Sequence, residues 1–87
     1  MDDLDTVLGI VVVPPRLDIL RRLREGDKTH SELSLELAKP YGMWDHMQKL
    51  LKVGAVIRIP VSPKEVRYRL NKKLLQELVG VLNELSM

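Results

Sequence analysis

The strongest constraint on the fold is a change in the spacing of apolar residues at Gly54. Before this glycine, apolar residues recur every three or four positions, the spacing of one face of a helix; they are Met43, Met47, Leu50 and Val53. After it, apolar and polar residues alternate in two runs separated by turn-forming residues 62–65, as expected for two β-strands. The sequence therefore predicts a helix over about 40–53, followed directly by a β-hairpin over 55–70.

The predicted hairpin is basic. Arg58 and Pro60 alternate with apolar residues in its first strand. Arg67 and Arg69 alternate in the same way in its second strand. We therefore expect an apolar underside and an opposite face that carries all three arginines, with Lys64 near the tip. Pro60 fits only the edge or end of a strand, which favours an exposed ribbon.

Two prolines separate the first two predicted helices. The first helix lies within residues 1–13, and the second covers 15–25, with Pro15 in its first turn and Gly26 at its end. The run Val11-Val12-Val13 suits a short strand equally well, because β-branched side chains lose rotamer freedom in a helix. Both structures stay open for these three valines.

A helix-turn-helix is predicted over residues 29–53. The run Thr29-His30-Ser31-Glu32 fits a capping box, in which hydroxyl and carboxylate groups bond the free amides at the start of a helix. A break of only a few residues around Ala38 follows, and Pro40 then begins the next helix. Two short helices joined by so tight a turn are typical of this motif.

The last predicted helix covers residues 71–87, with Asn71 as its cap. Its leucines step by three, four and three residues, and further apolar residues widen this side. A chain of 87 residues cannot cover so apolar a helix, so we expect a second copy of the chain to cover it. The predicted homodimer interface combines the first and last helices through Leu4, Val7, Leu8, Leu75, Leu78, Leu82 and Leu85.

The composition excludes several function classes. The chain has no cysteine, which excludes disulfides, thiolate metal sites and thiol catalysis. His30 and His46 lie in different predicted elements without the spacing of metal ligands, so no metal or other cofactor is expected. No nucleophile–base pair, glycine-rich phosphate loop or zinc-protease motif is present in the sequence, so we expect no enzyme activity.

The apolar run over residues 7–13 does not predict a membrane segment. It is far shorter than the roughly 20 residues that a helix needs to cross a bilayer. Asp2, Asp3 and Asp5 precede it, whereas a signal peptide carries positive charge there. We therefore expect one soluble, cytoplasmic domain over residues 1–87. A charged fraction of 30% without cysteine would also suit a thermophile.

Positive charge concentrates in the middle of the chain. Residues 28–73 contain ten Lys or Arg and four Asp or Glu, whereas the segments on both sides are net acidic. This distribution indicates a face that binds a polyanion such as nucleic acid, although a chance excess on a solvated surface would give the same count.

Three stretches between residues 13 and 71 match the pattern of one family. Val13-Pro14-Pro15-Arg16-Leu17-Asp18-Ile19-Leu20 resembles the Pro-x-Arg-x-x-Ile-Leu start of its second helix. The segment from Ser31-Glu32-Leu33 to Lys49-Leu50-Leu51-Lys52-Val53-Gly54-Ala55-Val56 resembles its helix-turn-helix, which ends in Leu-x-x-x-Gly-Leu-Val. Tyr68-Arg69-Leu70-Asn71 is similar to its Tyr-Arg-Leu-Asn exit from the wing. The family that these stretches resemble is the ArsR-like family of dimeric winged-helix repressors.

The resemblance implies a winged helix-turn-helix fold, mostly α with a β-hairpin (α+β), whose N- and C-terminal helices form the dimer interface. It also implies a sequence-specific repressor of transcription that binds double-stranded DNA as a homodimer. The helix over about 40–53 is then the recognition helix in the major groove, and the hairpin is a wing on phosphates or the minor groove. The implied DNA-binding residues are Tyr41, Trp44, His46, Gln48, Lys49, Arg58, Lys64, Arg67, Arg69 and Lys39.

Individual roles follow from side-chain chemistry. Gln48 can pair with adenine, and Lys49 with guanine or a phosphate. Trp44 either reaches a thymine methyl or sugar edge, or packs between helices as part of the core. The wing arginines either contact phosphates, or are ordinary solvated strand residues, or pair in part with Glu65 and Asp45. The turn before the fourth helix is one residue shorter than in the family, and residues 41–44 replace its small hydroxylic residues, so no base preference carries over.

A winged helix that binds protein instead of DNA is the alternative function. Such an adaptor would use Tyr41, Trp44 and the apolar last helix as contacts. A DNA-binding protein should gather its basic side chains on one continuous face, whereas an adaptor scatters them. The sequence does not identify a small-molecule effector.

Overall fold

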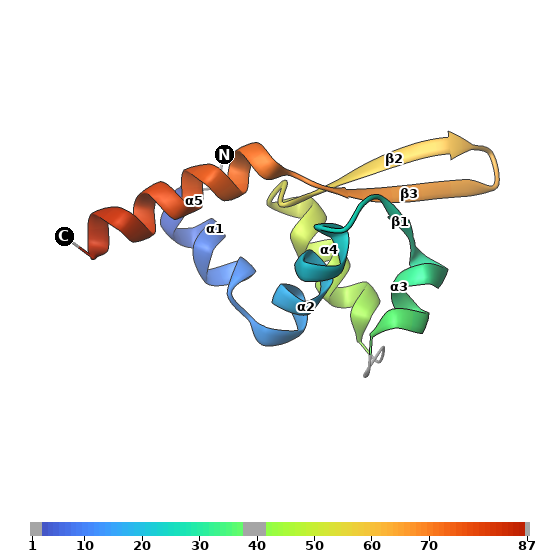
Figure 1. The fold of residues 1–87 in the computed structure, drawn as a ribbon, viewed down its shortest axis with the longest axis horizontal. Helices are drawn as coiled ribbons and strands as arrows, with labels where there is room; N and C mark the ends of the chain where they lie inside the picture. Colours follow the sequence, from blue (N-terminus) through green and yellow to red (C-terminus); the bar gives the residue numbers. More distant parts are fainter. Residues whose placement is uncertain (1–2, 38–41, 87) are drawn as a thin grey trace.

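A computed structural model describes residues 3–37 and 42–86 (Figure 1). This part of the chain has five helices and a three-stranded antiparallel sheet, and the predicted α+β winged helix-turn-helix is confirmed. In chain order the elements are α1 (Leu4–Val11), α2 (Pro14–Leu23), β1 (Lys28–Thr29), α3 (His30–Glu36), α4 (Met43–Lys52), β2 (Val56–Ser62), β3 (Glu65–Leu70) and α5 (Lys72–Leu85). The β2–β3 hairpin projects past the helices at one end of the molecule, and α5 extends toward the opposite end.

The boundary between α1 and α2 lies at the two prolines, as predicted. The Asp3 carboxylate caps α1 by accepting a hydrogen bond from a first-turn amide at 2.8 Å, and Pro14 begins α2. A strand in the valine run is wrong, because Val11 is helical and Val12 follows as the C-cap. Val13 is extended, which is the backbone that a residue before proline favours.

The predicted signals also bound α3 and α4. The capping box is complete: the Thr29 hydroxyl accepts from the Glu32 amide at 3.2 Å, and the Glu32 carboxylate accepts from the Thr29 amide at 3.4 Å. Gly54 follows the end of α4 with a positive φ of 81°, a conformation that glycine adopts without strain. The predicted start of α4 at Pro40 lies outside the described residues, within which the helix begins at Met43.

The sheet contains one strand that the sequence pattern did not predict. Strand β1 has two residues and pairs with β3, so the strand order is β1-β3-β2. Two residues are too few to show alternation, and β1 is a strand only because β3 lies beside it. Since α3 begins directly after β1, this pairing brings the start of α3 against the hairpin.

The hairpin does not carry its three arginines on one face, and that prediction is wrong. The register pairs Ile57 with Arg69, Ile59 with Arg67, and Arg58 with Tyr68. Residues directly opposite each other in an antiparallel pair point to the same side of the sheet. Arg67 and Arg69 therefore share a face with two isoleucines, whereas Arg58 lies on the other face with the buried Tyr68.

The core lies where α4 packs against α1, α2 and β2. Met43, Met47 and Leu50 are buried, as predicted for the inner side of α4, and Val53 is partly buried. All the other helices and the hairpin contribute further buried residues: Val7, Val11, Ile19, Leu20, Leu23, Leu33, Ala55, Val56, Tyr68, Leu70 and Leu78. This packing fixes α4 with one side in the core and the opposite side in solvent.

Candidate nucleic-acid interface

The side of α4 that faces solvent is polar and basic. Asp45, Gln48, Lys49 and Lys52 are exposed there, opposite the buried methionines. With 3.6 residues per turn, these four positions follow one another along one side of the helix. The predicted base-reading residues Gln48 and Lys49 are therefore accessible. Sequence reasoning missed Lys52, although its place four residues after Gln48 puts it on the same side.

Trp44 lies at the edge of this side and is not a core residue. It is 45% exposed, and its ring meets the ring of His30 from α3 edge-on, with centroids 5.7 Å apart and planes at 69°. Packing in the core is therefore wrong for Trp44. The indole rests partly on α3 and leaves the remainder open to solvent, where an aromatic edge can contact a sugar or a thymine methyl.

His46 is held by an arginine that the sequence did not single out. Arg16 is 8% exposed, and its Nε donates to His46 Nδ1 at 3.1 Å. Its Nη1 donates to the carbonyl of Ile10 at 2.6 Å, so one guanidinium joins α1, α2 and α4. Because Nδ1 accepts a hydrogen bond, neutral His46 carries its hydrogen on Nε2, which is left as a donor.

Arg69 in the wing forms a two-pronged ion pair with Asp27, the residue before β1. Its Nε lies 3.0 and 3.1 Å from the two carboxylate oxygens, and its Nη2 lies 2.7 Å from one of them. These hydrogen bonds hold the pKa of Asp27 below its ordinary value and raise the pKa of Arg69. The pair connects β3 to the segment before α3 and neutralises one of the predicted DNA-binding cations.

Arg67 is also paired. Its Nε donates to Glu65 at 3.3 Å, and its Nη1 lies 3.6 Å from the Glu32 carboxylate on α3. The same Nη1 donates to the carbonyl of Asp27 at 3.4 Å. The alternative that wing arginines pair with acidic neighbours is therefore what the structure shows for Arg67. Arg67 connects the wing to α3, and Arg69 connects it to Asp27 before β1.

Arg58 and Lys64 are the predicted wing cations without an ion pair inside residues 3–37 and 42–86. Both are exposed. Lys64 lies in the turn between β2 and β3, where its amide donates to the Ser62 hydroxyl at 3.3 Å. Lys39 and Tyr41, the two other predicted DNA-binding residues, lie outside the described residues.

Solved structures match this arrangement, although no protein-family sequence model matches the chain and no curated protein matches it in sequence. An ArsR-like transcriptional regulator from Rhodococcus sp. RHA1 has a TM-score of 0.81 and 25% identity, over 95% of this chain and 78% of that one. The chain has an ArsR-like winged helix-turn-helix fold. A possible transcriptional regulator for arsenical resistance has a TM-score of 0.78 and 21% identity, over 92% of this chain and 83% of that one. An ArsR family transcriptional regulator has a TM-score of 0.77 and 20% identity, and the match covers 95% of this chain and 86% of that one.

The resemblance drawn from the sequence is confirmed by these ArsR-like neighbours. All three are described as transcriptional regulators, which supports the prediction that the chain is not an enzyme. Within the described residues, no three His, Cys, Asp or Glu side chains gather as a metal site would require. Nor is any helix of residues 3–37 and 42–86 long and apolar enough to cross a membrane.

The ArsR-like fold leaves an apolar groove between α1, α2 and α5. The groove has a volume of about 300 Å³, and aliphatic side chains from the three helices line most of it. The predicted interface residues differ in exposure. Leu82 and Leu85 are 46% and 74% exposed, Leu4, Leu8 and Leu75 are partly buried, and Val7 and Leu78 are buried within the chain itself.

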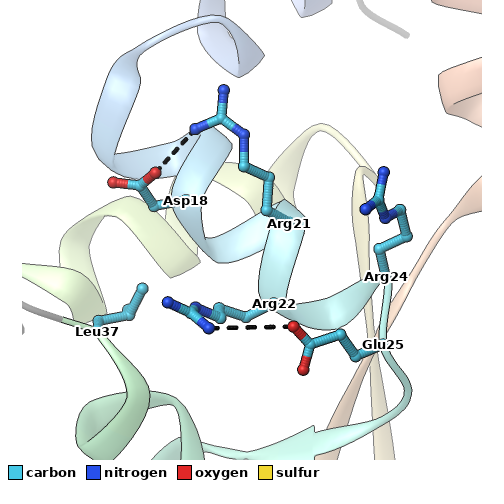
Figure 2. Close-up of a pocket in the computed structure, with 6 residues that line it drawn as sticks. All are labelled: Asp18, Arg21, Arg22, Arg24, Glu25 and Leu37. Carbon is cyan, nitrogen blue, oxygen red and sulfur yellow. Dashed lines mark hydrogen bonds and ion pairs between the residues drawn. The ribbon is translucent and has the colours of Figure 1, made fainter.

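A second hollow, of about 370 Å³, lies beside α2, and most of its charges are matched (Figure 2). Arg21 bonds to Asp18 at 2.9 Å, and Arg22 lies 3.9 Å from Glu25. Figure 2 shows each of these arginines turned toward its carboxylate. Two carboxylates therefore neutralise two of the three arginines around this hollow, and the third, Arg24, has no ion pair within residues 3–37 and 42–86.

Proposed function

We propose that this chain is a sequence-specific transcriptional repressor that binds double-stranded DNA as a homodimer, with α4 as the recognition helix. The observation that carries the proposal is the polar and basic outer side of α4, where Gln48 and Lys49 are accessible. The ArsR-like fold supports it. A major groove about 12 Å wide admits a helix, and base edges are distinguishable there.

Each exposed side chain of α4 has a role in this proposal. Gln48 pairs with adenine through its amide, and Lys49 contacts guanine or a phosphate. His46 donates from Nε2, because Arg16 occupies Nδ1. Asp45 accepts from a cytosine amine, and the exposed part of Trp44 contacts a thymine methyl or a sugar.

The wing contributes phosphate contacts that position the protein without reading sequence. Arg58 and Lys64 serve first, since they have no competing carboxylate within the described residues. Arg67 and Arg69 can contact phosphates only if their ion pairs with acidic residues break first. Lys39 and Tyr41, which precede α4 in the chain, would add further contacts.

The homodimer forms through α1 and α5 in this proposal. Val79, Leu82 and Leu85 expose apolar surface along α5, and Val12 does so after α1. A second copy would remove this surface from water, which is favourable by roughly 25 cal/mol per Å². Two copies present two recognition helices to successive turns of the major groove, and repression then follows from occupying the DNA.

A protein-binding adaptor is the second candidate, and one observation favours it. Leu35 on α3 is 87% exposed, and Ile57 on β2 is 42% exposed. A protein partner would cover such side chains, whereas DNA phosphates would not. An adaptor would bind no DNA, and its affinity for the partner would depend little on salt.

Binding to labelled random-sequence duplex DNA, followed by fluorescence anisotropy over a salt series, separates the two candidates. A DNA-binding protein should give a slope of log affinity against log salt of about −0.9 for each phosphate that it neutralises. Lys64→Gln should reduce the magnitude of this slope, whereas Arg22→Gln, in the neutralised hollow beside α2, removes the same charge and should leave it unchanged. A folded protein with no binding at low salt would rule out the regulator and favour the adaptor.

A further inference from the structure

Between α1 and α4 lies a hollow of about 360 Å³ that is lined by three cations. Arg16, Lys49 and Lys52 contribute the charges, and Thr6, Ile10 and Val53 complete the lining. None of the three cations forms an ion pair within residues 3–37 and 42–86. This hollow therefore differs from the one beside α2, where two carboxylates neutralise two of the arginines.

Arg16 makes the hollow selective for an anion. It is the only charged residue that is buried in the described part of the chain, yet no carboxylate accompanies it there. Its two hydrogen bonds to His46 and Ile10 use two of the five guanidinium N–H groups, which leaves three for a ligand. A buried cation without a counter-ion is costly, and a bound oxyanion would offset that cost.

We propose that this cradle, formed by Arg16, Lys49 and Lys52, binds one backbone phosphate of the DNA, an inference that rests on the proposed function. Lys49 and Lys52 lie on the same exposed side of α4 as Gln48. When a helix enters the major groove, phosphates line both walls of the groove, so side chains at its flank meet the backbone. Guanidinium and ammonium groups are the donors that proteins use most for phosphate.

The cradle gives α4 a fixed register on the DNA. Arg16 also holds His46 and the end of α1, so a phosphate bound there is tied to three helices through one side chain. Gln48 lies one turn before Lys52. The cradle would therefore position Gln48 along the groove, as backbone contacts position base contacts in general.

The test uses Lys52→Gln, because Arg16 joins three helices and its replacement also threatens the fold. Anisotropy titrations on random-sequence duplex DNA over a salt series compare wild type, Lys52→Gln and the matched control Arg22→Gln. We expect the magnitude of the slope to fall by about 0.9 in Lys52→Gln and to stay at the wild-type value in Arg22→Gln. Equal slopes in the two variants would overturn the cradle.

A second measurement separates a DNA phosphate from a free one. Thermal unfolding is compared in inorganic phosphate and in chloride at equal ionic strength. Phosphate could stabilise wild type but not Lys52→Gln, while both proteins give the same slope of log DNA affinity against log salt. The cradle would then be a site for a small anion, and its assignment to a DNA phosphate would be wrong. If wild type binds no DNA at any salt, the proposed function fails and the inference with it. If wild type binds with a slope of several units that Lys52→Gln retains, only the cradle fails.

Discussion

Asn71 connects the wing, α4 and α5, and replacing it tests how these elements are held together. Its Oδ1 accepts from the Leu74 amide at 3.2 Å and so caps α5. Its Nδ2 donates to the carbonyl of Gly54, just after α4, at 2.8 Å. Its own amide donates to Ala55 at 3.0 Å, and this bond does not depend on the side chain. The side chain therefore contributes two hydrogen bonds from a partly buried position.

We expect Asn71→Ala to lower the free energy of unfolding by about 2 kcal/mol. Loss of an N-cap costs about 1 kcal/mol. Loss of the hydrogen bond to Gly54 costs about 1 kcal/mol more, because the carbonyl is left without this donor. Asn71→Ser keeps a capping oxygen and removes the amide donor to Gly54, so we expect it to lose about 1 kcal/mol.

Urea unfolding followed by circular dichroism measures both variants, at one protein concentration because the stability of a dimer depends on concentration. A domain of this size loses about 4–8 °C in Tm for each kcal/mol, so Asn71→Ala should unfold about 10 °C lower than wild type. Equal losses in the two variants would show that the cap contributes nothing. A loss below about 0.5 kcal/mol in Asn71→Ala would refute the reasoning as a whole.

Three further predictions concern the core, the wing and the dimer. Leu50→Ala should destabilise the fold by about 3 kcal/mol in urea unfolding, since Leu50 is fully buried and its removal leaves a cavity under α4. The Arg69 hydrogen bond lowers the pKa of Asp27 below its ordinary 3.8, so this pair stabilises the fold above that pH, and the contribution disappears as pH falls through the folded value. The free energies of unfolding of wild type and Asp27→Asn should therefore differ at neutral pH and converge as pH falls through the lowered pKa of Asp27; a gap that persists at the acid end of the titration would contradict the assignment. Leu82→Glu should give a monomer in sedimentation, because it places a charge in the proposed apolar interface of the homodimer, whereas the control Glu84→Gln should remain a dimer.

Most elements could be predicted because their signals are local. The capping box at Thr29, the prolines before α2 and the change of spacing at Gly54 each involve residues a few positions apart. The buried side of α4 followed from the same local period. Strand β1 was missed because its partner, β3, lies beyond α4 in the chain, and its own two residues carry no pattern.

The face on which each wing arginine lies depends on contacts between segments. Alternation within β3 shows that Arg67 and Arg69 share a face, but it does not place Arg58 on β2. That placement depends on the register, which is irregular between Pro60 and Ser62, and a shift of one residue moves every side chain of a strand to the other face. The two separate patterns therefore could not determine whether Arg58 shares a face with Arg67 and Arg69.

A count of charges does not tell which cations are available to DNA. Arg69 and Lys52 both belong to the basic middle of the chain, yet Asp27 neutralises Arg69, whereas Lys52 has no ion pair within the described residues. The acidic partners come from the segment before β1, from α3 and from β3, so only the fold reveals the pairing. Lys49 and Lys52 on α4 and Lys64 at the wing tip are exposed without an ion pair in the described residues, whereas both β3 arginines are paired with acidic residues. We therefore expect substitutions on α4 to change DNA affinity more than substitutions of Arg67 or Arg69.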